Sequence, residues 1–575
     1  MVFQGKTLII FRNSILVLSF FVVGFGLYSH VLRGEFVSDD FITIVHNPAI
    51  KDVTAIKDIW CAFNTRFLVG WSFAWNYHFH QLDVWGYHLI NVWIHIFNTL
   101  LVFVFACWTL GLVKKDRLLP DPLVPSVAYF SALIFLTHPI QTQGVSYITQ
   151  RAVLLGTFFY LATLVSYICY RRSGNILFMA LSFLMMLMGI ICKEIVATLP
   201  VVILLYEVCF FRKKQDSIKR LIRYLLPYMA GLALLVILFK LDQPGSVLQL
   251  NSDVSHKTFS WQYFLTEINV LRTYLRLIVF PAGQNHHHDY PLVMKVFEWR
   301  TLFSVLLLGG LVWLAVACFK KHKLVTFCIG WFFITTSVEL MTVSFVQRKM
   351  MEEHWLYLPM VGVSFLPAYL LARGIKTMRV YRVVMTGAIV ILCFLSYQRN
   401  YVWQTEIAFW LDVYKKSPRH IASFIGLGQS YQHKDQLRQA EKVYQEALQF
   451  HPRSKVILNN LGVVLAKRGK EDHAVKVFHQ IIEISPTFMN PYNNIAFIYY
   501  NQREYEKAIV YYRQYLNVKD YNPRAYEYYG KSLVAVHAYP DAMRPLKKAL
   551  KLYERNKDSR KVEEIKKLLS SIPWD

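Results

Sequence analysis

The chain has 575 residues, of which 55% are hydrophobic and 16% aromatic, and its mean hydropathy is +0.31. These values exceed the averages of soluble proteins and predict an integral membrane protein. The formal net charge of +26 fits basic loops on the cytoplasmic side of a membrane. Because no dense basic stripe with interleaved aromatic residues is present, nucleic acid is not an expected partner.

Eleven apolar segments are long enough to cross a bilayer, for which roughly 17 to 25 residues are needed. We expect them to form a polytopic, all-α membrane domain over residues 1–397. Every second connection is basic, which places these connections and the N-terminus in the cytoplasm. The basic connections are 114–117, 171–172, 211–220, 320–323 and 373–382. The expected spans are centred in 13–32, 88–112, 122–137, 152–170, 176–192, 195–211, 222–240, 301–319, 324–345, 355–373 and 380–397.

The segment 262–280 is also apolar, but it contains Glu267, Arg272 and Arg276. The two arginines are four residues apart, on one face of a helix, which is typical of a helix that lies in the membrane interface. Counting it as a span would also break the alternation of basic loops. We therefore predict that the remaining loops share one outer face, namely 33–87, 138–151, 193–194, 241–299, 346–354 and everything after residue 397.

The first outer loop carries two adjacent carboxylates, Asp39 and Asp40, just beyond the first span. Such a pair suits a general base and its electrostatic partner, since the charge of one raises the pKa of the other. A solvated acidic loop is the alternative. Arg66, in the same loop, has a guanidinium that could bind phosphate oxygens, or it could be a juxtamembrane anchor.

Further ionisable residues lie where the later loops meet the membrane. His138 and Arg151 flank the second outer loop, and Lys193 and Glu194 form the next turn. Ionisable groups at this depth are costly, which favours a functional role, although a salt bridge between Lys193 and Glu194 would also explain them. The loop before residue 359 adds His354 and Tyr357. With Arg348, Glu352 and Glu353 of the same loop, they form a basic and acidic cluster that suits a site where a lipid phosphate is held while a carboxylate removes a proton.

A histidine triplet, His286 to His288, precedes Asp289 between two prolines. This composition raises the question of a divalent metal. However, three consecutive residues rarely converge on one ion, and the loop offers no further spaced ligands. No cofactor is firmly implied, and His288 and Asp289 stay candidate substrate contacts.

After residue 397 the composition becomes soluble and a 34-residue period appears. Small residues recur at Gly428, Gly462, Ala496 and Gly530, and again at Ala440, Ala474, Ala508 and Ala542. Large residues keep the same register at Tyr444, Phe478, Tyr512 and Leu546. This pattern predicts an α-solenoid of tetratricopeptide repeats over 421–556, with a capping helix at 558–570 and a linker at 398–420.

Asn460 and Asn494 occupy equivalent positions on the first helices of their repeats. Side-chain amides can satisfy the backbone of an extended peptide, so these two residues are candidates for binding an acceptor protein. Helix capping or contacts within the solenoid are the alternative.

Several motifs in this order resemble the transmembrane and tetratricopeptide-repeat-containing protein O-mannosyltransferases and their bacterial relatives. They are GEFVSDDFITIVHNP, TRFLVGWSFAWNY, GYHLINVWIHIFNTLLV, HPIQTQGVSYITQRA, CKEIVATLPVVILLYE, HHHDYP and HWLYLPMVG. The resemblance covers nearly the whole chain. It implies a GT-C-type helix bundle, a polyprenyl- or dolichyl-phosphate sugar as co-substrate, and protein hydroxyls as acceptors. The acidic motif of the family would correspond to Asp39 and Asp40.

The resulting hypothesis is an inverting transfer of one sugar from the lipid phosphate to a Ser or Thr hydroxyl of a protein. Asp39 would be the base and Asp40 would orient the acceptor. The donor phosphate would be held by Arg66, Arg151, Lys193 and His354, and substrate by His138, Glu194, His288, Asp289 and Tyr357. The expected membrane is either the bacterial inner membrane, with periplasmic repeats, or the ER membrane, with lumenal repeats. A non-catalytic membrane scaffold whose repeats recruit partners is the main alternative.

Overall fold

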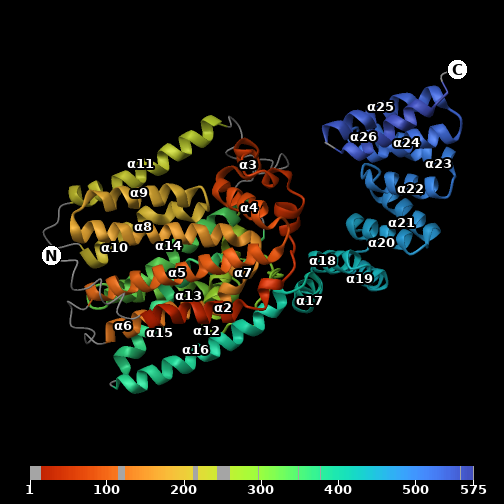
Figure 1. Ribbon diagram of the computed structural model, residues 1–575. Coiled ribbons are helices and arrows are strands. Elements are labelled where there is room, and N and C mark those ends of the chain that lie inside the picture. Colours follow the sequence, from red (N-terminus) through yellow and green to blue (C-terminus); the bar gives the residue numbers. More distant parts are fainter. Residues whose placement is uncertain are drawn as a thin grey trace. The chain divides into compact units, whose positions relative to one another are not determined.

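The computed structural model describes residues 14–113, 123–211, 218–242, 259–295, 297–346, 349–375, 377–556 and 558–573. These residues form helices and connections without any strand, which confirms the all-α prediction. The chain divides into two compact units, residues 1–412 and residues 413–575, hereafter the membrane unit and the repeat unit (Figure 1). Each unit is described by itself.

Every segment predicted to span the membrane falls on a helix of the membrane unit. These helices are α2 (Ser14–Tyr28), α5 (Val84–Val113), α6 (Leu123–Thr137), α8 (Arg151–Ser173), α9 (Ile176–Ile190), α10 (Leu199–Tyr206), α11 (Ile218–Asp242), α13 (Trp299–Cys318), α14 (Lys323–Val346), α15 (Pro359–Gly374) and α16 (Met378–Asn400). Among the described residues, six helices are long and apolar enough to cross a membrane, or seven if a pair bent by 49° at His138 is one span. Shorter apolar helices add to these, so the count of about eleven spans stays a prediction.

Aromatic side chains fill the interior of the membrane unit. The Phe105 ring on α5 lies within 5.7 to 6.1 Å of the rings of Tyr206, Phe327, Trp331 and Phe365. These contacts join α5 to α10, α14 and α15, and in Figure 1 α8 lies along α9 and α5. Large rings in a close-packed interior hold these helices together, and the polar loops extend from the opposite end of the bundle.

Short helices occupy the loops at this end. They are η1 (Val31–Arg33), η2 (Phe41–Val45), η3 (Pro48–Lys51), α3 (Ile56–Phe63), η4 (Asn64–Arg66), α4 (Phe67–His80), η6 (Pro139–Gln141), α7 (Thr142–Ser146), η7 (Ile148–Gln150), η8 (Glu194–Thr198) and η10 (Glu353–Leu356). The first loop has its own apolar cluster, which includes Ile44, Ile50, Ile59 and Phe73. Burial of these side chains gives the loop that carries Asp39 a defined structure.

The segment predicted to be an interfacial helix is α12 (Trp261–Val279). One face buries Glu267, Val270 and Tyr274, while Arg276 is exposed. This division fits the amphipathic pattern of the sequence. The basic connections at 114–117 and 212–217, and residues 243–258 of the loop before α12, lie outside the described residues.

The predicted linker at 398–420 is largely helical, with η11 (Tyr401–Trp403) and α17 (Glu406–Lys416). Its first part belongs to the membrane unit, because Trp403 and Phe409 are buried with ring centroids 6.1 and 4.8 Å from that of His286. Large aromatic side chains gain from such burial, which a solvated linker would forgo.

The repeat unit consists of paired helices and a final single helix. The pairs are α18 (Ile421–His433) with α19 (Leu437–Phe450), α20 (Lys455–Lys467) with α21 (Glu471–Ile484), α22 (Asn490–Asn501) with α23 (Tyr505–Leu516), and α24 (Pro523–Ala535) with α25 (Tyr539–Arg555), followed by α26 (Ser559–Ser571). A β-carbon at Gly428 would lie 2.3 Å from the Tyr444 ring, and one at Gly462 would lie 2.5 Å from the Phe478 ring. The small residues therefore make room for the large residue of the partner helix, as the period predicts.

Candidate functional site

Loops that are distant in the sequence meet at one end of the membrane unit. The backbone N–H of Asp39 donates to the Tyr147 hydroxyl over 3.0 Å, and Arg66 Nη2 donates to Glu194 Oε1 over 2.9 Å. Gln143 Nε2 donates to Glu352 Oε2 over 2.9 Å. The structure thus brings together the loops that the sequence places on one face.

The two adjacent aspartates have different surroundings. Asp40 is fully buried, and its carboxylate accepts hydrogen bonds from the backbone N–H groups of Val37 at 3.1 Å and Thr149 at 3.0 Å. Burial raises the pKa of Asp40 to about 7, although these two amides oppose the rise. The side chain of Asp39 is exposed. Asp40 therefore holds the loop in place, and of the two carboxylates only that of Asp39 is exposed.

A chain of opposite charges joins the first loop to the turn after α9. Glu194 Oε1 lies 2.9 Å from Arg66 Nη2 and 3.7 Å from Lys193 Nζ, which in turn lies 3.7 Å from Glu339 Oε1. Arg66 and Glu194 are half-exposed, whereas Lys193 and Glu339 are buried. The salt bridge considered for Lys193 and Glu194 is present. Arg66 and Lys193, two of the four residues predicted to hold a phosphate, already have carboxylate partners.

Arg151 lies apart from this charged chain, fully buried at the start of α8. Its guanidinium donates to Asn91 Oδ1 at 2.8 Å, Asn76 Oδ1 at 2.5 Å and the carbonyl of Tyr87 at 3.0 Å. It also lies 4.5 Å from the centroid of the Phe73 ring. In this structure Arg151 ties the first loop to α5 and α8, and its side chain does not reach solvent.

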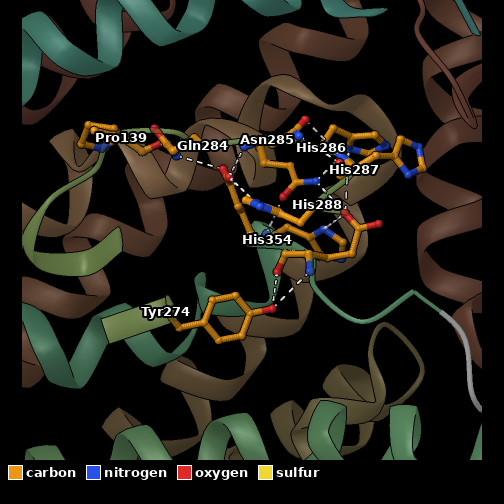
Figure 2. Close-up of polar contacts among 12 residues, drawn as sticks. Pro139, Tyr274, Gln284, Asn285, His286, His287, His288 and His354 are labelled. Carbon is orange, nitrogen blue, oxygen red and sulfur yellow. Dashed lines mark hydrogen bonds and ion pairs between the residues drawn. The ribbon is translucent and has the colours of Figure 1, made fainter. Parts of the chain in front are cut away.

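The histidine loop, whose His286, His287 and His288 are labelled in Figure 2, packs against two buried glutamates, Glu352 and Glu353. Glu353 Oε1 accepts from the backbone N–H of Asn285 at 2.5 Å and lies 3.0 Å from His288 Nε2. The Tyr274 hydroxyl donates to the carbonyl of Glu352 at 2.9 Å and accepts from its N–H at 3.1 Å. These contacts fix the loop at the base of the cluster, while Asp289 is exposed.

His286, His287 and His288 have different partners, as expected of consecutive residues. His286 Nδ1 lies 2.9 Å from Gln143 Nε2, and the His287 ring is stacked on Trp410 at 5.6 Å between centroids. Throughout the part of the chain that the structure describes, no group of three or more His, Cys, Asp or Glu residues is arranged to hold a metal ion.

Three further predicted site residues are buried in the unit. The Tyr357 hydroxyl lies 2.6 Å from His95 Nδ1, and His138 Nε2 donates to the carbonyl of Ile278 over 2.9 Å. The backbone N–H of His354 donates to Gln143 Oε1 over 2.7 Å. Burial, and then the charges of nearby lysines and Arg66, hold the pKa of His354 well below its usual range. Its imidazole is therefore neutral at pH 7.

Four residues of this cluster were not predicted as site residues: Gln143, Glu267, Glu339 and Lys349. Glu339 lies within the apolar helix α14, and a carboxylate inside a predicted span is a signal that could have identified it. Burial, and then the charge of Glu339, raises the pKa of Glu267 to about 9. Lys349, which is half-exposed, lies 2.8 Å from Glu352 Oε1. It therefore adds a third cation to the cluster.

In the repeat unit, the two predicted asparagines have neighbours within the solenoid. Asn494 Nδ2 donates to Asn459 Oδ1 over 3.1 Å, which joins α22 to α20. The Nδ2 atom of Asn460 is buried and has no hydrogen-bond partner among the described residues. The hydrogen bond of Asn494 to Asn459 is a contact within the solenoid, which was the alternative to binding an acceptor protein.

The fold and the cluster define a class: an all-helical chain that joins apolar helices to a tetratricopeptide-repeat unit. A family model described as "Tetratricopeptide repeat" matches residues 490–522. A crystal structure of MamA protein covers 26% of this chain and 83% of its own, at 20% identity and a TM-score of 0.24. This similarity is too weak to support an argument about function.

Curated relatives match most of the chain. Protein O-mannosyl-transferase F38B6.6 of Caenorhabditis elegans is 25% identical over 77% of this chain and 63% of its own length. Tmtc3 of Drosophila melanogaster is 23% identical over 81% and 58%, and human TMTC3 is 24% identical over 92% and 63%. The chain spans about three fifths of the length of these relatives. The predicted resemblance is confirmed: the chain is similar to the TMTC proteins, which are named protein O-mannosyl-transferases.

Proposed function

We propose that the chain is a membrane glycosyltransferase of the GT-C type. It would move a single sugar from a polyprenyl- or dolichyl-phosphate donor to a Ser or Thr hydroxyl of a protein. The similarity to proteins named O-mannosyl-transferases supports the reaction class. The observation that carries the proposal is the accessible carboxylate of Asp39, which the buried Asp40 and Tyr147 hold at the centre of the converging loops.

In this mechanism Asp39 acts as the general base. It accepts the proton of the acceptor hydroxyl while that oxygen forms a bond to the anomeric carbon of the sugar. The bond from the same carbon to the phosphate oxygen breaks, and its electron pair leaves with the lipid phosphate. A single displacement of this kind inverts the anomeric configuration. Asp40 supports the step indirectly, because its two backbone hydrogen bonds fix the loop.

The departing phosphate gains negative charge, so cations aimed at it stabilise the transition state. Arg66 is half-exposed and uses Nη2 to bind Glu194, which leaves other N–H groups of the guanidinium for phosphate oxygens. Lys349 is half-exposed as well and could contact the phosphate. Lys193 is buried and would contribute its charge without direct contact. His354, being neutral, would contribute a hydrogen bond and no charge.

We assign acceptor binding to the repeat unit, whose first helices carry Asn460 and Asn494. Tetratricopeptide arrays present an extended surface to peptides, and side-chain amides can pair with a peptide backbone. The reaction would take place in the periplasm of a bacterium or in the ER lumen.

The test is transfer by the purified full-length protein from radiolabelled polyprenyl-phosphate sugars to candidate acceptor proteins. Asp39→Asn should lower the rate by roughly 10²- to 10⁴-fold, because a positioned general base contributes about that much. Asp58→Asn is the matched control, since Asp58 is an exposed aspartate of the same loop on α3. Transfer by Asp39→Asn at the rate of the control would refute the assignment.

A non-catalytic scaffold is the second candidate, and one observation favours it. Both Arg66 and Lys193 are already paired with glutamates, as they would be in a purely structural cluster. A scaffold predicts that Arg66→Gln leaves donor binding unchanged. The glycosyltransferase predicts weaker binding of the lipid-phosphate sugar by the same variant. Equilibrium binding of a labelled donor to the wild type and to Arg66→Gln distinguishes the two candidate functions.

A further inference from the structure

A cavity of about 610 Å³ lies in the membrane unit where α2 and α16 end and α5 begins. It is lined mainly by Ser29, His30, Arg33, Trp85, Gln404 and Thr405. The helices α2 and α16 are in direct contact here, because Asn400 Nδ2 donates to the carbonyl of Leu27 over 3.1 Å. Its volume is within the range of small-ligand sites, and no role in the proposed reaction uses it.

The charge of this cavity favours an anion. Arg33 is the one charged residue among those that line it, and its side chain is exposed. Within the described ranges, the Arg33 guanidinium forms no ion pair or hydrogen bond with another residue. Thr405 and Gln404 add neutral donors, whereas the Ser29 hydroxyl already donates to the Gly26 carbonyl over 2.9 Å, and no carboxylate lines the cavity. A guanidinium without a partner is well suited to two oxygens of a phosphate.

Two exposed apolar stripes lead to this cavity. On α2 the exposed positions recur every three or four residues, at Ile15, Leu18, Val22, Gly26 and Ser29, and the same spacing then reaches Arg33. Much of α16 is exposed, and one line of exposed positions along it, Val383, Gly387, Val390, Phe394 and Tyr397, continues to Tyr401 on η11, just before Gln404. Each stripe is a continuous face of its helix, because residues three and four apart are neighbours.

We propose that this cavity binds the headgroup of an anionic phospholipid. The phosphate would contact Arg33, and the two acyl chains would lie on the stripes of α2 and α16. The presence of two separate apolar faces favours a lipid with two chains over a polyprenyl phosphate, which has one. The Trp85 ring at the edge of the cavity suits this position, since tryptophan is enriched where headgroups meet acyl chains.

The test uses the full-length protein in nanodiscs of phosphatidylcholine with or without phosphatidylglycerol. Native mass spectrometry then measures the phospholipid that the protein retains after release. Wild-type protein should retain phosphatidylglycerol, and Arg33→Gln should retain it about tenfold less well, as expected for the loss of a charged hydrogen bond. Arg382→Gln, which removes an exposed arginine near the other end of α16, should behave as wild type.

Equal retention by Arg33→Gln, or an equal loss in Arg382→Gln, would overturn the proposal. Two competition arms identify the source of the phosphate. Displacement of phosphatidylglycerol by polyprenyl phosphate would show a site for a single-chain lipid, and displacement by inorganic phosphate alone would show an anion site without chains. Either result would contradict the proposed phospholipid.

A second variant tests the stripe on α2. A β-carbon at Gly26 would meet no atom within 4 Å, so Gly26→Leu fits the fold while it fills the path of an acyl chain. It should lower phosphatidylglycerol retention. Gly309→Leu on α13 is the matched control, because Gly309 is equally open. If both variants retain the lipid as wild type does, the stripe is not its binding surface.

Discussion

The contacts inside the repeat unit differ in kind from those inside the membrane unit. In the repeat unit, Gly462 receives the ring of Phe478 from the next helix of the same repeat. In the membrane unit, Gln143 bonds Glu352 across 209 residues, and Arg66 bonds Glu194 across 128. The repeat unit is built from one short-range apolar contact used again and again. The membrane unit has an apolar core as well, but polar contacts of long range join its loops, which is why a site can form there.

This difference has an energetic consequence. A buried polar contact stabilises a fold modestly while it is intact, but the loss of one partner leaves the other unsatisfied. A small residue that makes room for a ring of the partner helix is sensitive instead to enlargement, because a larger side chain overlaps that ring. Substitutions should therefore affect the two units separately, and hydrogen exchange in the full-length protein can report on each.

The largest effect is expected at Arg151. Arg151→Met should destabilise the membrane unit by about 3 kcal/mol or more, since Asn76, Asn91 and the Tyr87 carbonyl all lose a buried donor. Hydrogen exchange should rise in the first loop and at the start of α8, with the repeat unit unchanged. Arg276→Met is the control, because the exposed Arg276 makes one contact, to the Ala282 carbonyl at 2.9 Å. Similar exchange in both variants would contradict the stabilising role of the buried Arg151 hydrogen bonds.

The converse effect is expected at Gly462. Gly462→Leu should cost about 1 to 3 kcal/mol, because any β-carbon there overlaps the Phe478 ring. Exchange should rise in α20 and α21 and stay unchanged in the first loop. A double variant with Phe478→Ala should recover part of the loss by restoring space. If stability does not recover, overlap with the Phe478 ring is not the cause of the loss.

A pH-dependent effect is expected at Asp40, whose pKa is raised to about 7 from an ordinary value of about 3.9. The folded protein binds the proton more tightly than the unfolded chain, so this stabilisation is complete below about pH 4 and is lost as pH rises to about 7. The slope contributed by one group is at most about 1.4 kcal/mol per pH unit. Asp40→Asn should flatten the fall in melting temperature over this window. An unchanged slope would contradict the raised pKa.

The smallest effect is expected at Asn494. Asn494→Ala should lower stability by about 0.5 to 1 kcal/mol, since it removes a partly buried hydrogen bond to Asn459. If Asn494 also binds the acceptor, the variant raises KM for the protein acceptor and leaves kcat unchanged. Asn517→Ala, outside the first helices, is the control. An unchanged KM would limit Asn494 to its structural contact.

Much of the architecture could be predicted from local sequence. Hydrophobic length located every predicted span on a helix, and the 34-residue period located each repeat helix and the final helix α26. Both signals are short-range, because they depend on the pitch of one helix or on the contact of two adjacent ones. The linker was predicted less well, since nothing local indicated that Phe409 packs against His286.

For the candidate site, the sequence indicated some of the residues that meet there but not their arrangement. The sequence named Asp39, Asp40, Arg66 and Lys193, and placed their loops on a common face. It could not tell that Asp40 is buried beneath two backbone amides while Asp39 is exposed, because that depends on Val37 and Thr149. Likewise arginine is a residue type that often binds phosphate, and only the buried hydrogen bonds of Arg151 show that it stabilises the fold.

By itself, the sequence determined the helical class, the membrane and repeat units, and the residue types available for chemistry. Apolar length and periodic spacing are properties of neighbouring residues, so they can be read without a fold. The tertiary structure alone decided which carboxylate is open, which cations are already paired, and where Arg33 has no partner. Burial and pairing depend on residues distant in the chain, and these are the quantities that set charge, protonation and access.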